Sequence, residues 1–394
     1  MKRILLIGLV FFIIVMSPGT ACASAESSPS VPFASQTSDI LEDASLEEID
    51  DYLYHLDNNL SEFLEDFSLS GIWRGVKDGD FQLSASGLFA LLGKVFFKEV
   101  LASWALLGQL LLLALLSIIL SSLGGAFEKE NISRLARGVI YLLLAAIAIS
   151  AFSVSLEVAK EAVDMMSGFL YAVLPLLMIL LAAMGGVSSV GILHPSMLFA
   201  ISVLMTAMSR IIFPLIYFSA ILRLISHISS KFSVDKLAGL FKDIALGFMS
   251  FGVGIFIAFM GVSGIASASI DGLAVKAAKS ASGFIPIVGR SFADALDSVL
   301  GTALLLKNGI GVIGVVVILV ICALPAAKIL VQVLIFRLAG AVIQPLGDKQ
   351  LANALTGLSN ALLLLFAAVA ICGLLFFFLL AISIGVGNIT MMMR

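Results

Sequence analysis

Two ionisable side chains, His194 and Arg210, lie inside the longest apolar stretch of this sequence. Between residues 164 and 223 the single formal charge is Arg210, four residues before Pro214. A charge within a membrane segment is costly, so such residues often line a path for an ion or a polar substrate. The alternative is structural, because an Arg near a helix end can extend its guanidinium to the membrane surface. Both interpretations of Arg210 stay open.

A second polar group contains Arg290, Asp294 and Asp297. The two carboxylates are three residues apart, which places them close together on one helix. Paired carboxylates invite an acid–base or cation-site interpretation. The alternatives are a solvated helix face or one turn of helix lining a polar vestibule. These three residues are the candidate vestibule.

The motifs of cofactor and metal chemistry are absent from the sequence. It contains no GxxxxGK[ST] phosphate loop and no HExxH zinc motif, and its three histidines are far apart. No nucleophile–base set stands at a recognisable spacing. The three cysteines indicate neither a disulfide framework nor a CxxC site. We therefore expect no cofactor, no metal and no enzymatic activity.

The composition is that of a membrane protein. The 394 residues are 60% hydrophobic and 12% charged, whereas soluble proteins are about 25% charged. The apolar stretch 168–226 is interrupted by helix breakers, and broken helices at membrane depth occur where they face protein or a polar cavity. We interpret this stretch as the packed centre of a conduit or gate. The candidate pathway or gating residues are Gly185, Gly186, His194, Pro195, Arg210 and Pro214.

The fold class expected is all-α, a polytopic membrane protein with about seven or eight crossings after removal of a signal peptide. The membrane domain covers 83–394. Spans are expected at 101–123, 139–156, 168–226 (as two or three), 244–264, 309–327 and 361–384, with 329–346 a short span or re-entrant piece. The acidic segment 157–164 is expected outside the cytoplasm, and the basic segments 124–138 and 226–243 inside it. This arrangement favours three short spans in 168–226, near 168–184, 188–208 and 211–226.

The N-terminus reads as an export signal. Residues 1–23 combine a basic start, an apolar run and an Ala-Cys-Ala site, which predicts cleavage after Ala23. A lipoprotein attached through Cys22 and an uncleaved anchor are the alternatives. Each reading places the acidic segment 24–82 outside the cytoplasm. Residues 24–80 hold fourteen of the 26 acidic residues, so nucleic acid is not an expected partner.

A heptad seam follows within this acidic segment, in a helix predicted over 45–70. Its apolar residues recur at alternating spacings of three and four, and such a seam needs a partner. The partner is either another part of this chain or another extracytoplasmic protein. The candidate seam residues are Leu46, Ile49, Leu53, Leu56, Leu60, Phe63 and Phe67.

Three stretches together resemble the stage III sporulation protein AE family of endospore-forming bacteria. They are 98–116 (KEVLASWALLGQLLLLALL), 174–195 (LPLLMILLAAMGGVSSVGILHP) and 283–314 (GFIPIVGRSFADALDSVLGTALLLKNGIGVIG). The resemblance extends over most of the chain from about residue 85 onward. The last stretch is its most specific part, and the acidic N-terminal segment adds little.

The resemblance implies a multi-pass protein of the mother cell, located in the membrane that surrounds the forespore. It implies membership of a channel complex between the two cells that supports the forespore after engulfment. The implied partners are other stage III sporulation membrane proteins, including a secretion-type ATPase and ring-forming subunits, and a forespore-side protein across the intermembrane space. No catalytic residues follow from it. An autonomous small-solute permease is the alternative function, and an intramembrane enzyme is a third.

Overall fold

The computed structural model describes the backbone of residue 54 and of residues 85–126, 130–184, 186–226, 234–282, 288–346 and 348–392. Side chains are described at residue 54 and within 93–119, 138–184, 186–226, 234–264, 309–346 (except 312) and 348–386. Within these ranges the chain is helical and contains no strand, which confirms the all-α prediction.

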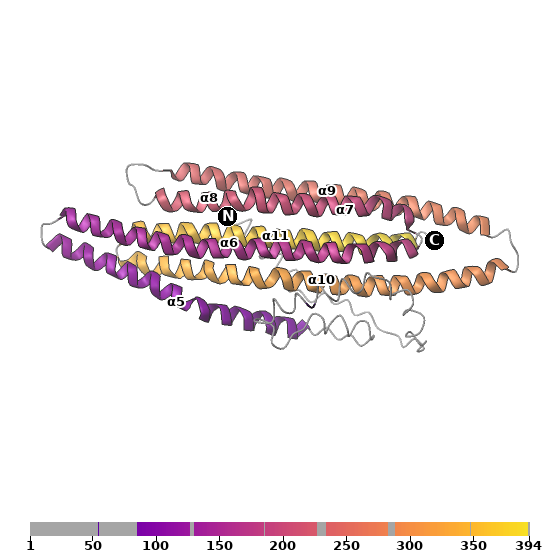
Figure 1. Ribbon diagram of the computed structural model, residues 1–394, viewed down its shortest axis with the longest axis horizontal. Coiled ribbons are helices and arrows are strands. Elements are labelled where there is room, and N and C mark those ends of the chain that lie inside the picture. The colour runs from indigo at the N-terminus through magenta and orange to yellow at the C-terminus, as the bar shows by residue number, and fades with distance from the viewer. Residues whose placement is uncertain are drawn as a thin grey trace.

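Consecutive helical segments run antiparallel and form one elongated bundle (Figure 1). The elements are α5 (Ala85–Ala126), α6 (Glu130–Ala183), α7 (Val187–Ala207), the π-helical η1 (Met208–Ile212), α8 (Phe213–Ser226), α9 (Asp235–Ser282), α10 (Val288–Ile343), the 3-10 turn η2 (Gln344–Leu346) and α11 (Lys349–Met392). Their sequences are mostly Leu, Ala, Ile, Val and Phe. A helix satisfies its own backbone polar groups, so such apolar runs can remain in lipid.

The helices are much longer than one membrane requires. At about 1.5 Å per residue, the 54 residues of α6 extend about 81 Å. In the described part, six helical segments are long and apolar enough to cross a membrane: Gly93–Ile119, Gly138–Ala183, Val187–Ser226, Asp235–Gly264, Gly309–Leu346 and Lys349–Val386. The number of crossings and the signal peptide remain predictions.

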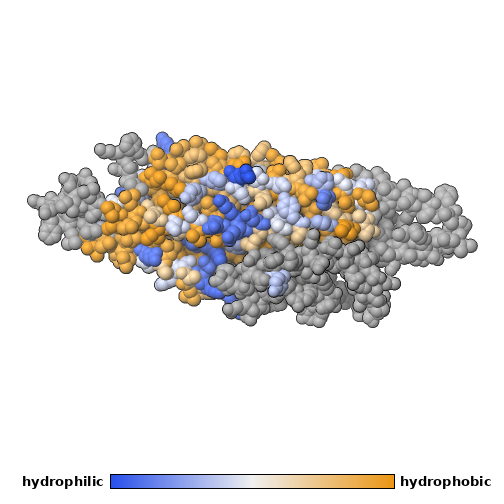
Figure 2. All heavy atoms as spheres, in the orientation of Figure 1, coloured by the Kyte–Doolittle hydropathy of each residue, from blue (hydrophilic) through white to orange (hydrophobic). Residues whose placement is uncertain are grey.

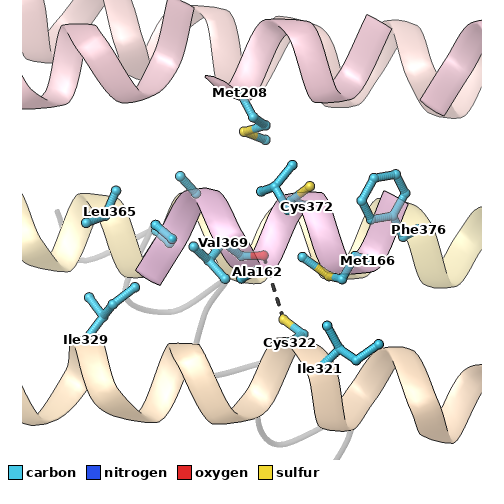
Figure 3. Packing of buried hydrophobic residues seen from close by; sticks show 14 of the residues in the cluster. Ala162, Met166, Met208, Ile321, Cys322, Ile329, Leu365, Val369, Cys372 and Phe376 are labelled. Atoms are coloured by element: carbon cyan, nitrogen blue, oxygen red, sulfur yellow. Dashed lines mark hydrogen bonds between the residues drawn. The ribbon is translucent and has the colours of Figure 1, made fainter. Parts of the chain in front are cut away.

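The core of the bundle lies along α11, which packs against α6, α10 and α9. In the close view (Figure 3), Met166 of α6, Cys322 of α10 and Cys372 of α11 lie among the buried apolar side chains. The Cys322 thiol donates to the Val369 carbonyl at 3.7 Å. Because Gly373 has no side chain, α10 approaches α11 closely beside Cys322. Apolar side chains therefore fill the centre of the bundle at this level.

The positions of the turns differ from the sequence-based expectation. The acidic segment 157–164 was expected to join two spans, but α6 continues through it without a break. A turn does lie at 184–186, whereas the turn expected near 210 is replaced by continuous helix. Segments 309–327 and 329–346 likewise belong to one element, with Pro325 inside α10. Charges and prolines predict turns, but a long helix tolerates both when neighbouring helices support it.

The two basic segments come to the same end of the bundle. Helices α5 and α6 meet near residues 126–130, and α8 and α9 meet near 226–235, at one end in Figure 1. Two antiparallel passes, α6 and then α7 to α8, separate these connections. Three crossings within 168–226 are therefore not needed to bring both basic segments to one side.

The turn between α6 and α7 depends on Gly186. Its N–H donates to the Leu181 carbonyl at 3.0 Å, and its own carbonyl accepts from Val190 at 3.0 Å. A Cβ at this position would lie 2.9 Å from both the carbonyl oxygen and Cδ1 of Leu181. Since the backbone oxygen cannot move aside without opening the turn, this position requires glycine.

We predict that Gly186→Ala lowers the free energy of unfolding by about 1–3 kcal/mol, the usual cost of overpacking. The measurement is the midpoint of thermal unfolding in lipid nanodiscs. Gly191→Ala is the matched control, because it lies on the same helix and its added Cβ would meet nothing within 4 Å. We expect the control to be unchanged or slightly stabilised. Equal midpoints for the two variants would contradict this account of the turn.

Candidate functional site: a charged belt and an open groove

Charged side chains gather around the middle of the bundle rather than only at its ends. Figure 2 shows hydrophilic residues near mid-length on the visible face, with hydrophobic surface to either side. We call the following residues the charged belt: Lys94, Lys98 and Glu99 of α5; Glu157, Lys160, Glu161 and Asp164 of α6; Arg210 of η1; Lys242 and Asp243 of α9; and Lys328 of α10.

Contacts between helices show that these charges lie at similar levels. Ser155 of α6 donates to Gln332 of α10 at 2.9 Å, which places Lys328 between the levels of Glu157 and Lys160. The hydroxyls of Tyr171 and Ser202 are 3.0 Å apart, and Ser167 contacts Met205. Since α6 and α7 are antiparallel, Arg210 then lies at about the level of Asp164.

Contacts between neighbouring helices also fix the levels of the charges on α5 and α9. Gln109 of α5 lines one groove with Ile147 of α6, so Glu99 lies near the level of Glu157. Ser219 of α8 donates to the Ala238 carbonyl of α9 at 2.8 Å, which places Lys242 about one turn closer to mid-length. The belt therefore includes residues from α5, α6, η1, α9 and α10.

Charge-free bands lie on both sides of the belt. On one side, five helices have no formal charge over about 19 or more residues, roughly 28 Å or more of helix. We call this the five-helix band: 165–183, 187–209, 244–264, 309–327 and, on α11, the part of the charge-free run 351–386 that lies beyond the level of Lys328. On the other side, the hairpin band comprises 101–119 of α5 and 138–156 of α6. Each band is about as thick as a bilayer's hydrocarbon core, ~30 Å.

Arg210 lies on the outer surface of the bundle. It is exposed, and no ion pair involves it within the described part of the chain. It is far from both ends of the continuous helix from Val187 to Ser226. The structure thus places Arg210 at the belt, facing outward, and not along an internal channel of one chain.

Pro214 explains the π-helical turn beside Arg210. Proline has no N–H, so the Arg210 carbonyl cannot receive the usual bond from four residues further on. The Phe213 N–H instead donates to the Met208 carbonyl, five residues back. Short π-helical segments often occur at functional sites. Here the turn holds Arg210 without breaking the helix.

The other candidate gating residues lie nearer the end of the five-helix band. Gly186 forms the N-cap of α7, while Gly185 lies outside the described residues. His194 is half-buried and Pro195 is exposed within α7. Arg210 lies about four helical turns away from His194 along the same continuous helix. The structure therefore does not bring Arg210 into one site with the other candidate gating residues.

The candidate vestibule and the candidate seam cannot be described at the level of side chains. Arg290, Asp294 and Asp297 belong to the first turns of α10, but their side chains lie outside the described residues. The seam, from Leu46 to Phe67, also lies outside them. Among the described residues, no group of three His, Cys, Asp or Glu side chains is arranged to hold a metal ion.

An open groove on the hairpin band was not predicted. It has a volume of about 470 Å³ and lies between α5 and α6, lined by Leu106, Gln109, Ala146, Ile147, Ser150 and Ala151. The Gln109 side chain is exposed and makes no hydrogen bond within the described part of the chain. The signal for this groove was the pair Ala146 and Ser150, because small residues four apart allow another helix to approach closely.

The bundle defines a polytopic, all-α membrane protein. The chain matches the family model "Stage III sporulation protein AE" over residues 67–387. It is also 38% identical over 318 residues to a protein named Stage III sporulation protein AE from Bacillus subtilis (strain 168), covering 80% of each chain. The chain therefore belongs to the stage III sporulation protein AE family. No solved structure matches it.

We predict that Arg210→Gln reduces the yield of heat-resistant spores at least tenfold while protein abundance stays normal. Because Arg210 is exposed, its loss should change the free energy of unfolding by no more than about 0.5 kcal/mol. Spore counts and immunoblots of the same cultures provide the measurement. Arg337→Gln, which removes an exposed charge from α10, is the matched control. Normal spore counts for Arg210→Gln would contradict a functional role for this residue.

Proposed function

We propose that this protein is a membrane subunit of a multiprotein channel complex between the mother cell and the forespore, needed after engulfment. Membership of the sporulation family supports the setting. The observation that supports membership of a complex is the pair of charge-free bands. A hydrocarbon core of ~30 Å covers one band, and the belt separates it from the other. The second apolar surface then needs a protein partner.

Lipid, in this proposal, covers the five-helix band. All five of its segments are charge-free, and its outward side chains include Ile179, Phe199, Phe251, Ile255 and Val262. The belt then lies at the membrane surface, where charges are hydrated at little cost. The basic segments at the α5–α6 and α8–α9 connections favour a cytoplasmic location for that end of the bundle. The membrane is the one around the forespore.

The hairpin band is the proposed contact with other subunits. An exposed amide such as Gln109 is poorly accommodated by lipid, but a hydrogen-bonding side chain on a neighbouring helix would satisfy it. The groove beside it is lined by small residues, including Ala146 and Ser150, that allow a close approach. We propose that a helix from another stage III sporulation membrane protein fills it.

The apolar centre of the bundle favours a conduit between chains over one inside this chain. Leu365, Val369, Cys372 and Phe376 of α11 are all buried against neighbouring helices. Arg210 faces the outside of the bundle, where a pathway between subunits would pass it. A separate secretion-type ATPase would supply energy, ring-forming subunits and a forespore-side protein would complete the conduit, and this chain would have no enzymatic role.

We predict that Ser150→Phe reduces co-purification of the stage III sporulation ATPase and ring-forming subunits at least fivefold, because the larger side chain fills the groove. Affinity purification from cells collected after engulfment, with quantification of each named subunit, provides the measurement. Leu143→Phe is the matched control, since Leu143 is exposed two turns away on α6 and does not line the groove. The control should retain the subunits.

Two outcomes would overturn the proposal. One is an intact complex around Ser150→Phe at normal protein level. The other is substrate-dependent solute uptake by the isolated wild-type protein in liposomes, which would instead establish an autonomous permease.

A further inference from the structure

The exposed face of α6 beside the groove continues into the charged belt. Ser150, Glu157 and Asp164 follow one another at intervals of seven residues, close to two helical turns, so their side chains lie along one line. Glu161 lies one turn from Glu157, next to the same line. All four side chains are exposed. We call Glu157, Glu161 and Asp164 the acidic row, and together with the groove they form one continuous surface.

The acidic row has no partner within the described part of the chain. No ion pair or side-chain hydrogen bond there involves any of its three carboxylates. Lys160 is the only cation in the segment 157–164, which keeps a net charge of −2. Within the same described ranges, the belt cations at similar levels on other helices form no ion pair with the row: Lys94 and Lys98 of α5, Arg210 of η1 and Lys328 of α10. A negative surface is therefore open to another molecule.

The groove itself selects a helix with small and hydrogen-bonding side chains. Ala146 and Ser150 are four residues apart and leave room for a close backbone approach. The exposed Gln109 amide, across the groove on α5, requires a donor or an acceptor from its neighbour. The acidic row begins seven residues beyond Ser150 and ends fourteen residues beyond it, about 10–21 Å along the helix. A helix that extends along both features therefore meets apolar surface at one level and carboxylates at the next.

We infer that the partner helix in the groove has a basic segment, whose Lys or Arg side chains pair with Glu157, Glu161 and Asp164. This inference rests on the proposed function, in which a helix of another stage III sporulation membrane protein fills the groove, and it adds the chemistry of that helix. Charge complementarity supports this occupant, because a neutral helix would leave the row without counter-charges and an acidic helix would be repelled. Complementary charges would also fix the register of the partner helix along α6 and suppress wrong partners.

The level of the acidic row agrees with a partner helix that crosses the membrane. In the proposed arrangement the belt lies at the cytoplasmic surface of the bilayer, and the five-helix band lies in lipid. Helices that cross a membrane usually have Lys or Arg at their cytoplasmic ends. Such a helix would leave the bilayer at the belt, place its basic residues against the acidic row and continue into the groove.

The first test measures how much of the sporulation ATPase and ring-forming subunits the full-length protein retains on affinity purification from sporulating cells. Glu161→Lys reverses one charge of the row, and we expect at least a fivefold loss of these subunits at normal protein abundance. Glu161→Gln should lose less, and added salt should reduce its difference from wild type, because salt screens exposed charges. Asp243→Lys is the matched control, since it makes the same reversal at an exposed belt position on α9 and should keep the subunits.

The second test identifies the helix that covers the row. Val154→p-benzoylphenylalanine places a photoreactive side chain between Ser150 and Glu157, at a position that is 53% exposed, and leaves every charge in place. Mass spectrometry of the cross-linked peptide should show a sporulation subunit with Lys or Arg within about two helical turns of the joined residue. Ile179→p-benzoylphenylalanine is the control, because Ile179 is equally exposed but faces lipid in the proposed arrangement and should join no subunit.

Several outcomes would overturn the inference: no cross-link at residue 154, a cross-link to a second copy of this chain, to lipid alone or to a helix without Lys or Arg near the joined residue, or equal retention by wild type and Glu161→Lys. Release of the subunits by Ser150→Phe together with their retention by Glu161→Lys would refute the basic helix and leave the proposed complex intact. Wild-type protein that retains no sporulation subunit would refute the proposed function itself, and this inference with it.

Discussion

The thickness of a bilayer is the constraint on which the arrangement of this protein depends. A hydrocarbon core measures ~30 Å, whereas α6, with 54 residues, is about 81 Å long. Charged residues such as Lys160 and Asp164 divide that length near its middle. An exposed charge cannot remain among lipid tails at low cost. In our proposal, the charged belt therefore fixes where a membrane can lie, and the other apolar band needs a second kind of cover.

The tightly packed core fixes the positions of the helices relative to one another along the bundle. Along α11, small residues such as Gly373 let α10 approach closely, and buried Phe376 and Leu365 fill the space between the helices. Few polar side chains are buried among the described residues, and some of them are paired, as Ser359 is with the Val333 carbonyl at 3.1 Å. A centre packed in this way supports the bundle as a rigid unit, and places the surfaces available to ions or partners on its outside.

Much of the fold could be predicted from the sequence, including the breaks near 126–130, 184–186 and 226–235, but some expected turns are absent from the structure. Apolar runs of bilayer length identified most of the helical segments, since hydropathy reports burial in lipid directly. The charges at 157–164 predict a loop because charged side chains need water, yet water also reaches the outside of a long helix. Pro214 predicts a helix break, but it removes only one N–H donor, and a π-helical turn accommodates that loss. The groove combines residues from different helices, and no single-sequence pattern specifies such pairs.

Accessibility of single cysteines to a membrane-impermeant maleimide tests the placement of the belt most directly. The background chain lacks Cys22, Cys322 and Cys372, and is reconstituted alone in nanodiscs. Our account predicts rapid labelling of Glu161→Cys in the belt and protection of Ile179→Cys, one α6 residue in the five-helix band that is also exposed on the bundle surface. Labelling of Ile179→Cys together with protection of Glu161→Cys would contradict it, because lipid would then cover the belt and not the five-helix band.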